Sequence, residues 1–346
     1  MKTIFVIDDN DTNLLIAKNT LDGAYKTFAM SSASRLFTLS KKIIPDLILL
    51  DVDMPEMDGF EAMEALKVDE KLKSVPVIFL TAKNDAETEV RGFEMGAIDF
   101  INKPFSPPVL LKRIETHLET DRLIKASQQA LRDIHNATIN VIADMVESRD
   151  EITGGHVERT QMYLKILIRE MIRTGVYVDE LSDWDMDLLL PSAQLHDVGK
   201  IVISDVILNK PGKLTPEEFE LIKQHCEEGE RIIDKIISKT EDDGFLHHAR
   251  RFASSHHERW DGTGYPRQLA GTDIPLEGRI MAIVDTYDAL ISKRPYKKAF
   301  SHEQATKIIL EGFGTQFDPK LVEVFSNHAD DFWAESISIN YENIGG

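Results

Sequence analysis

Short apolar runs alternate with helix-like patterns along the first 105 residues. Strands are predicted at Ile4–Ile7, Tyr25–Met30, Leu47–Leu50, Val75–Leu80 and Phe100–Ile101. Between the first two runs, Leu14, Ala17 and Leu21 recur at the three- and four-residue spacing of one helix face. Runs such as LILL and VIFL are apolar at every position, as expected for parallel strands buried on both faces. This region is therefore predicted to be a doubly wound α/β domain with a five-stranded parallel sheet.

From about residue 135 onward, apolar positions follow the helical period and the strand-like runs disappear. Proline and glycine mark the connectors of this half, at Pro191, Pro211–Gly212, Gly262–Gly264 and Pro275. An all-α domain is therefore predicted over residues 135–330. The residues after it, 331–346, are predicted to form a C-terminal tail without chemistry.

A long stretch with few helix-breaking residues, Pro107–Val146, joins the two halves. Apolar residues recur along it every three to four positions, but Asp121, Lys125 and Gln128 interrupt the stripe. Two interpretations stay open. The stretch could be the last helix of one domain packing on its neighbour, or a signalling helix that dimerises as an imperfect coiled coil.

The composition agrees with two folded domains. At about 150 residues per domain, a chain of 346 residues holds two, and 42% hydrophobic residues exclude disorder of the whole chain. The chain has 40 Lys and Arg against 59 Asp and Glu. The net charge of −19 argues against a nucleic-acid partner, so a phosphate ligand would need a local cluster of cations or metal ions.

Three observations predict a cytoplasmic protein without a membrane partner. No run reaches the roughly 18 apolar residues that a membrane span needs. The opening MKTIFVIDD enters a predicted strand at once and shows no signal-peptide pattern. The single cysteine, Cys226, cannot form an internal disulfide, which fits a reducing compartment.

Charged and polar residues end the predicted strands of the first half. They are Asp8 and Asp9 after the first strand, Asp51 after the third, Thr81 after the fourth and Lys103 after the fifth. The carboxyl ends of parallel strands meet at one edge, and the carboxylates gathered there would repel one another without a cation such as Mg²⁺. A carboxylate beside Mg²⁺, lysine and a hydroxyl could accept a phosphoryl group. Helix capping would explain Asp8 or Asp9 alone, but not five elements at one edge.

Residues 1–120 resemble a response-regulator receiver domain, through the motifs IDDN, DLILLDVDMPEMDGFE, FLTA and INKPF. The resemblance implies that Asp51 accepts a phosphoryl group from a histidine kinase. It implies that Asp8, Asp9 and Asp51 bind Mg²⁺ together with the backbone carbonyl of Asp53. Thr81 and Lys103 would contact the phosphoryl group. Phe100 would be the switch aromatic, and Pro104 would follow a cis peptide bond.

The second half holds histidines and aspartates in a suggestive order. They are His156, His196, Asp197, His225, His256, His257 and Asp285. Imidazole and carboxylate suit Fe, Mn, Zn or Ni, and seven such side chains exceed the needs of one ion, which favours a two-metal centre. The adjacent His196 and Asp197 could place a carboxylate between two ions. Any one histidine alone would more simply be a hydrogen-bonded structural residue.

Residues 135–330 resemble the HD superfamily of metal-dependent phosphohydrolases, and within it the HD-GYP branch. The motifs are ESRDEITGGHVERT, LHDVGKIVI, LIKQHCEEGERII, SSHHERWDGTGYP and IVDTYDALISKRPYK. The resemblance implies that the seven side chains are metal ligands, with Asp197 bridging. Iron or manganese would be the ions, although nickel and zinc are not excluded by these ligands.

The same resemblance implies residues that bind the substrate. Lys200, Arg294 and Lys297 would contact its phosphates, although a solvated basic turn would also explain the last two. Tyr265 would stack on a base or dock a partner, unless its segment is simply a tight turn. Some members of the branch carry a glutamate four residues before the first ligand histidine and bind a third metal. Ile152 occupies that position here, with Glu151 beside it, so a dinuclear centre is predicted.

The combined resemblance predicts a homodimeric response regulator that hydrolyses cyclic di-GMP to pGpG, and possibly onward to GMP. Asp197 and Lys200 would be its catalytic residues, and phosphorylation of Asp51 would act through the linking helix. Two alternatives remain: an HD-type hydrolase of another nucleotide or cyclic dinucleotide, and a non-catalytic adaptor that binds cyclic di-GMP or proteins through the GYP loop.

Overall fold

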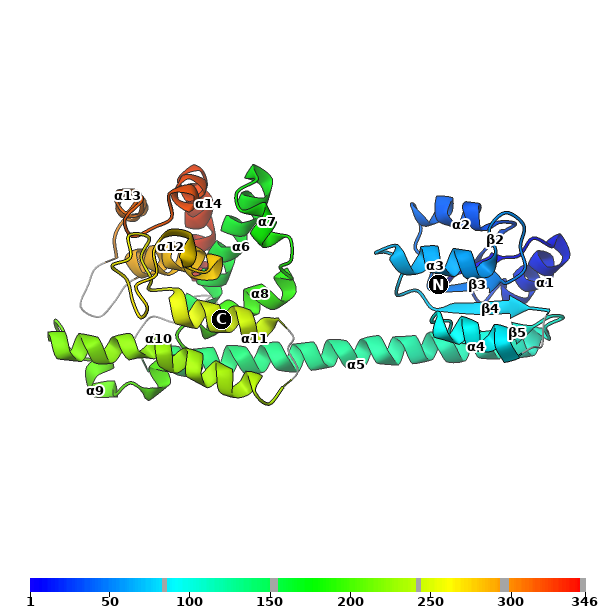
Figure 1. The fold of residues 1–346 in the computed structure, drawn as a ribbon, viewed down its shortest axis with the longest axis horizontal. Coiled ribbons are helices and arrows are strands. Elements are labelled where there is room, and N and C mark those ends of the chain that lie inside the picture. Colours follow the sequence, from blue (N-terminus) through cyan, green and yellow to red (C-terminus); the bar gives the residue numbers. More distant parts are fainter. Residues whose placement is uncertain (83–85, 150–154, 241–243, 293–298, 343–346) are drawn as a thin grey trace. The chain divides into compact units, whose positions relative to one another are not determined.

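The computed structural model forms two compact units, Met1–Arg132 and Asp133–Gly346. It describes residues 1–82, 86–149, 155–240, 244–292 and 299–342, and side chains up to residue 337 (Figure 1). Helix α5, Pro107–Glu147, covers the linking stretch as one continuous helix that begins in the first unit and ends in the second.

The first unit is built on a five-stranded parallel sheet in the order β2-β1-β3-β4-β5. Its strands are β1 Thr3–Ile7, β2 Lys26–Met30, β3 Leu47–Asp51, β4 Val77–Thr81 and β5 Asp99–Asn102. All five predicted strands are therefore confirmed, with shifts of one or two residues at their ends. The central strands β3 and β4 are buried at every position, as their unbroken apolar sequences predict.

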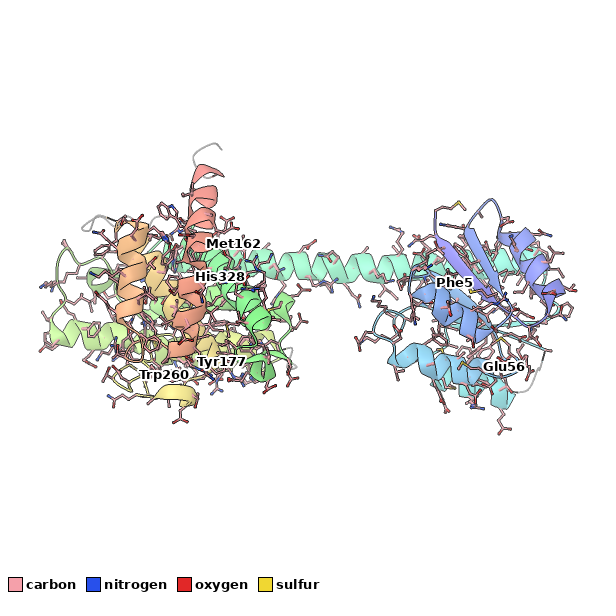
Figure 2. All side chains as sticks on the ribbon, turned by 90° about the horizontal axis from the view of Figure 1, so that it is seen from above. Phe5, Glu56, Met162, Tyr177, Trp260 and His328 are labelled. Atoms are coloured by element: carbon pink, nitrogen blue, oxygen red, sulfur yellow. The ribbon has the colours of Figure 1, made fainter. Side chains whose placement is uncertain are left out.

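Helices cover both faces of this sheet. They are α1 Asp11–Leu21, α2 Ala33–Ser40, α3 Gly59–Val68, α4 Ala86–Glu94 and the first part of α5. Side chains of a strand point to alternate faces. Phe5 of β1, labelled in Figure 2, thus packs with α2 and α3. Its neighbours Ile4 and Val6 pack with α1 and α5.

The described part of the second unit is helical and contains no β-strand. Its α-helices are α6 His156–Thr174, α7 Val178–Leu181, α8 Met186–Ser192, α9 Asp205–Leu208, α10 Pro216–Ile237, α11 Phe245–Ser255, α12 Leu276–Ile291, α13 His302–Glu311 and α14 Pro319–Glu342. Three short 3₁₀ helices, η1 Ala193–Leu195, η2 Val198–Val202 and η3 Gly271–Asp273, complete it.

An aromatic cluster joins α6, α12 and α14 in the core of the second unit. The ring centroid of Tyr163 lies 5.4 Å from that of Tyr287 and 5.0 Å from that of Phe332, and all three side chains are fully buried. The predicted tail over 331–346 is therefore wrong at its start. Phe332 belongs to the core because α14 continues past residue 330.

The last part of α5 has one buried face and one exposed face. Ile139 and Val198 belong to the same buried cluster, which also holds Phe245 of α11. On the opposite face, Val141 and Met145 are 57% and 65% exposed. No helix in the described ranges is both long and apolar enough to span a membrane.

Candidate metal centre and receiver pocket

The seven side chains predicted as ligands converge into two groups of the second unit. One group holds His156, His196 and Asp285, and the other holds Asp197, His225, His256 and His257. Within each group, one nitrogen or oxygen atom of every residue lies within 4.8 Å of those of the others. Residues separated by up to 129 positions in sequence thus meet at one place.

Asp197 lies between the two groups. Its Oδ2 is 3.5 Å from Nε2 of His196, and its Oδ1 is 3.4 Å from Nε2 of His225 and 3.7 Å from Nε2 of His256. Bonds from such atoms to a metal are about 2.0–2.2 Å long, so these separations fit atoms that share an ion. The two oxygens of one carboxylate face different groups, which is the arrangement of a bridging ligand.

Backbone carbonyls orient three of the histidine rings. Nδ1 of His196 lies 2.9 Å from the carbonyl oxygen of Ala193. Nδ1 of His225 lies 2.7 Å from that of Ile222, and Nδ1 of His256 lies 2.9 Å from that of Phe252. Because a carbonyl can only accept, each Nδ1–H donates and each Nε2 keeps its lone pair. The lone pairs face the cluster, as metal-binding imidazoles require.

A carboxylate orients the fourth ring. Nδ1 of His156 is 2.7 Å from Oδ2 of Asp288, whose Oδ1 accepts from Nε of Arg159 at 2.7 Å. Sequence reasoning missed Asp288 and Arg159. The available signal was their spacing, since each follows a candidate ligand by three residues on the same helix, Asp285 on α12 and His156 on α6.

The donor atoms fit a metal. The buried atoms Nε2 of His196 and Oδ1 of Asp197 have no hydrogen-bond partner within the described structure, an arrangement that costs free energy unless a cation satisfies both. Burial lowers the pKa of His257 to about 4, and burial with the neighbouring His257 lowers that of His256 well below its ordinary range. Both rings are therefore neutral at pH 7, as a metal ligand must be.

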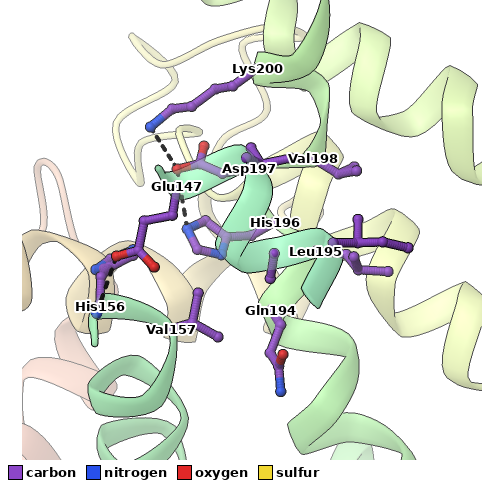
Figure 3. Close-up of a pocket in the computed structure, with 12 residues that line it drawn as sticks. Glu147, His156, Val157, Gln194, Leu195, His196, Asp197, Val198 and Lys200 are labelled. Atoms are coloured by element: carbon purple, nitrogen blue, oxygen red, sulfur yellow. Dashed lines mark hydrogen bonds and ion pairs between the residues drawn. The ribbon is translucent and has the colours of Figure 1, made fainter. Parts of the chain in front are cut away.

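Lys200 extends toward the same carboxylate (Figure 3). Its Nζ is 2.8 Å from Oδ2 of Asp197. Burial raises the pKa of Asp197, but the positive charge of Lys200 opposes this, and the pKa lies well below its ordinary range. Asp197 is therefore ionised, and Lys200 adds a positive charge beside the centre.

Two glycines allow the elements that carry these ligands to touch. A Cβ on Gly199, in η2, would collide with the backbone of His225 and Gly229 on α10. Only glycine lets η2, which follows Asp197 directly, approach α10 this closely. Both glycines stand within the HD-GYP-like motifs, but their packing role could not be deduced from the sequence.

A cavity of about 750 Å³ opens beside the metal-facing side chains and is lined by His257, Asp285 and Tyr265. The ring of Tyr265 lies 4.8 Å from that of His257. Lys223 and Phe219 also line the cavity, with the Lys223 ammonium 5.0 Å from the Phe219 ring and 5.6 Å from the Tyr265 ring. Sequence reasoning missed Lys223 and Phe219.

Four residues of the sequence-based interpretation lie outside the described residues. They are Glu151, Ile152, Arg294 and Lys297. The predicted contacts of the two cations with substrate and the predicted count of two metals therefore stay predictions.

The receiver pocket lies at the carboxyl edge of the first unit's sheet. Asp8, Asp9 and Asp51 form a group that could hold a metal ion. Nζ of Lys103 is 2.7 Å from Oδ2 of Asp8 and 2.6 Å from Oδ2 of Asp51. Thr81 is fully buried at the end of β4, next to this group in the sheet. The sequence-predicted residues thus meet at one edge.

Two further receiver predictions concern the pocket's surroundings. The peptide bond between Lys103 and Pro104 is cis, as expected. The backbone N–H of Asp53 lies 3.4 Å from Oδ1 of Asp51. Burial raises the pKa of Asp51 to about 6, the hydrogen bond from Lys103 opposes that rise, and the nearby Asp8 adds to it.

Phe100 lies in an aromatic environment beneath α4. Its ring centroid is 5.3 Å from that of Phe79 and 5.1 Å from that of Phe93. Only glycine fits at position 92, because a Cβ there would collide with the Phe100 ring. Phe100 therefore occupies an inward position against α4.

Comparisons with known proteins agree with this architecture. Residues 4–115 match the response regulator receiver domain and residues 140–321 match the HD domain. A "probable cyclic di-GMP phosphodiesterase" of Vibrio cholerae is 39% identical, with 93% of this chain and 77% of the relative covered. The "cyclic di-GMP phosphodiesterase response regulator RpfG" of Xanthomonas campestris is 34% identical, with 80% and 74% covered. A "3'3'-cGAMP-specific phosphodiesterase 2" of Vibrio cholerae is 38% identical, with 60% and 38% covered.

The two family matches fall on the two units of the structure. The HD-domain match alone spans more than half of the 346 residues. The first two relatives align over most of their own length. This chain therefore belongs to the response regulators in which a receiver domain precedes an HD domain.

Proposed function

We propose that the chain is a phosphorylation-controlled phosphodiesterase that hydrolyses cyclic di-GMP to pGpG, with further cleavage to GMP as an extension of the same chemistry. The observation that carries the proposal is the position of Asp197, with one carboxylate oxygen toward each group of candidate ligands. Two relatives named as cyclic di-GMP phosphodiesterases, over most of whose length this chain aligns, support the substrate.

The seven side chains described above would hold two divalent ions, iron or manganese. When bound, such ions supply a hydroxide nucleophile near neutral pH and stabilise charge on phosphoryl oxygens. Asp197, ionised and held by Lys200, would bridge the two positions. Lys200 would balance the negative charge that develops on the substrate, and Arg294 and Lys297 would assist it.

The cavity beside the centre suits a cyclic dinucleotide. Its volume of about 750 Å³ lies within the range of roughly 300–1,000 Å³ that is usual for small-molecule sites. Tyr265 and Phe219 supply aromatic faces on which a purine could stack, and Lys223 supplies a cation. The hydrolysed phosphate would lie at the metal-facing end, near Asp285.

The receiver unit would control this reaction. A histidine kinase would phosphorylate Asp51 while Asp8, Asp9, Asp51 and the Asp53 carbonyl hold Mg²⁺. Thr81 and Lys103 would then bind the phosphoryl oxygens, and Phe100 would change its packing. The support is the close group of carboxylates with Lys103 between Asp8 and Asp51.

The active form would be a homodimer formed along α5. The exposed apolar side chains of this helix are spaced by three, four or seven residues. They include Ile124, Leu131, Ile134, Val141 and Met145, each more than half exposed. This stripe has the heptad-like spacing of a helix that pairs with a second copy.

A second substrate is favoured by one specific observation. The 3'3'-cGAMP-specific relative is 38% identical over 209 residues, which amount to 60% of this chain. Exchange of one guanine for adenine changes only base contacts, so the same metal chemistry would serve.

A substrate panel tests the proposed function. The full chain, loaded anaerobically with Fe²⁺ or Mn²⁺, is given cyclic di-GMP, 3'3'-cGAMP, cyclic di-AMP and GMP at equal concentration. The highest kcat/KM is expected with cyclic di-GMP, and pGpG is the first product seen by chromatography. A preference for 3'3'-cGAMP would select the second candidate. Binding of cyclic di-GMP without turnover of any substrate would reject catalysis in favour of an adaptor.

A further inference from the structure

The end of α5 contacts the helix that begins with a candidate ligand. His156 is the first residue of α6, and the residue before it, Gly155, has no side chain to cap the helix. Oε1 of Glu147, the last residue of α5, accepts a hydrogen bond from the backbone N–H of His156 at 3.2 Å (Figure 3). A carboxylate at a helix N-terminus satisfies an otherwise unpaired N–H and interacts favourably with the helix dipole.

Arg149, two residues beyond α5, contacts the element that follows Asp197. Its guanidinium donates to the carbonyls of Lys200 at 3.3 Å, Ile201 at 2.8 Å and Ile203 at 2.9 Å. Lys200 and Ile201 lie in η2 and Ile203 follows it directly, at a helix end where carbonyls need partners from outside the helix. Oδ1 of Asp205 accepts from the same guanidinium at 2.7 Å, and Asn209 donates to the Arg149 carbonyl at 2.7 Å.

We propose that Glu147 and Arg149 position α6 and η2, and thereby carry the state of α5 into the metal centre. The inference rests on the proposed function, in which the HD domain binds metal ions and α5 carries the receiver's signal. His156 belongs to one ligand group and Asp197 faces both. A displacement at the end of α5 would therefore change both groups at once.

The end of α5 and the candidate ligands line the same small cavity. A small cavity of about 20 Å³ separates this end of α5 from the centre, and Glu147, His156, Asp197 and Lys200 all line it. A cavity of this size holds about one water molecule, so a displacement of α5 would reach the candidate ligands directly. Glu147 and Arg149 act only through other residues, so they are positioning residues.

The test measures metal affinity in the full chain without substrate. Arg149→Ala and Glu147→Ala are compared with Arg122→Ala and Glu119→Ala, a Glu–Arg pair on the exposed surface of the same helix. Removing outer partners of metal ligands typically weakens binding about 10- to 100-fold, so about tenfold weaker Mn²⁺ binding is expected by chelator competition. Arg149→Lys should recover part of the loss, because it keeps the charge but not the fork of donors.

Unfolding of the metal-free variants distinguishes residues that position the candidate ligands from residues that only stabilise the fold. If the free energy of unfolding falls while Mn²⁺ affinity stays at the wild-type value, the two residues only stabilise the fold and the inference is overturned. Equal Mn²⁺ affinity in test and control variants also overturns it.

A second measurement tests whether the state of the receiver unit reaches the metal centre. Beryllofluoride mimics a phosphoryl group on Asp51, and it should change the Mn²⁺ affinity of the wild type and of the two control variants. In Arg149→Ala, beryllofluoride should change the Mn²⁺ affinity much less than in the wild type. The inference is contradicted if the affinity changes as much in Arg149→Ala as in the wild type, or if it does not change in the wild type. Mn²⁺ binding is read without substrate, so a wild type that binds metal but leaves cyclic di-GMP intact rejects only the proposed function.

Discussion

Asp288 is the residue on which the orientation of His156 depends. It is fully buried, bonds the His156 ring through Oδ2, and accepts from the Arg159 guanidinium through both carboxylate oxygens. Arg159 is itself only 3% exposed. A buried cation that loses its partner is strongly destabilising, because its charge remains in a region of low dielectric.

Asp288→Asn is therefore expected to lower the free energy of unfolding by about 3 kcal/mol, at the low end for a broken buried ion pair. It should also weaken metal binding, since an amide holds the His156 ring less firmly than a carboxylate. Urea denaturation of the metal-free protein measures the first effect. Asp183→Asn, at an exposed position, is the matched control. Equal stability of the two variants would contradict this account of the ion pair.

Glu277 gives the second unit a pH-dependent contribution to stability. Burial raises its pKa, but the hydrogen bond from His248 and the charge of Arg251 outweigh this and lower it below the ordinary 4.5. A carboxylate with a lowered folded-state pKa stabilises the fold above its unfolded-state pKa. That contribution is lost as the pH falls through the folded-state value.

Glu277→Gln should therefore be less stable than the wild type at pH 7, and the difference should narrow as the pH falls below about 4.5. Urea unfolding of both proteins at pH 7, 5 and 4 measures the difference in free energy. A difference that stays constant or widens toward pH 4 would show that Glu277 does not contribute as an ionised partner of His248 and Arg251.

At the scale of elements, the contact between η2 and α10 determines whether Asp197 and His225 meet. Gly199→Ala would push the two backbones apart, because its Cβ would strike His225 and Gly229. Overpacking of this kind costs about 1–3 kcal/mol, and metal affinity should fall as well.

Gly229→Ala provides a graded comparison for that prediction. Its Cβ would meet the Ala253 side chain at 3.2 Å, a contact that a small shift relieves. The free energy of unfolding and the Mn²⁺ affinity should therefore change less in Gly229→Ala than in Gly199→Ala. The reverse order would mean that close approach at Gly199 does not hold the centre together.

Some elements could be predicted from the sequence and others could not. β3 and β4 were predictable because their apolar runs are continuous. The clustering of the candidate ligands was predictable because they stand in specific motifs. The continuation of α14 through Phe332 was missed, although Phe325, Ala329 and Phe332 recur at the four- and three-residue spacing of one helix face. Asp288 and Arg149 were missed because their partners, up to 132 residues away, become neighbours only in the folded chain.

At the scale of the whole molecule, Asp51 and the metal centre belong to different units. An element that contributes residues to both units can carry a signal from one to the other. α5 is the element that contributes residues to both units, and its exposed apolar stripe offers a surface for a second copy. Control of hydrolysis by phosphorylation therefore predicts changes in oligomeric state and in turnover together.

Asp51→Asn should abolish both responses, because an amide cannot form the acyl phosphate. In the wild type, acetyl phosphate or beryllofluoride should change the dimer fraction, measured by light scattering, and kcat for cyclic di-GMP. In the variant, neither should change, while basal Mn²⁺ binding stays at the wild-type level. A response that persists in Asp51→Asn would place the signal input elsewhere.

The central claim is a two-metal centre bridged by Asp197, and one measurement tests it directly. Protein purified anaerobically and reconstituted with Mn²⁺ is analysed for metal per chain and for hydrolysis of cyclic di-GMP, beside Asp197→Ala. The account predicts two ions per wild-type chain with turnover, and loss of both turnover and at least one ion in the variant. Turnover retained in Asp197→Ala, or a single ion in a fully active wild type, would contradict it.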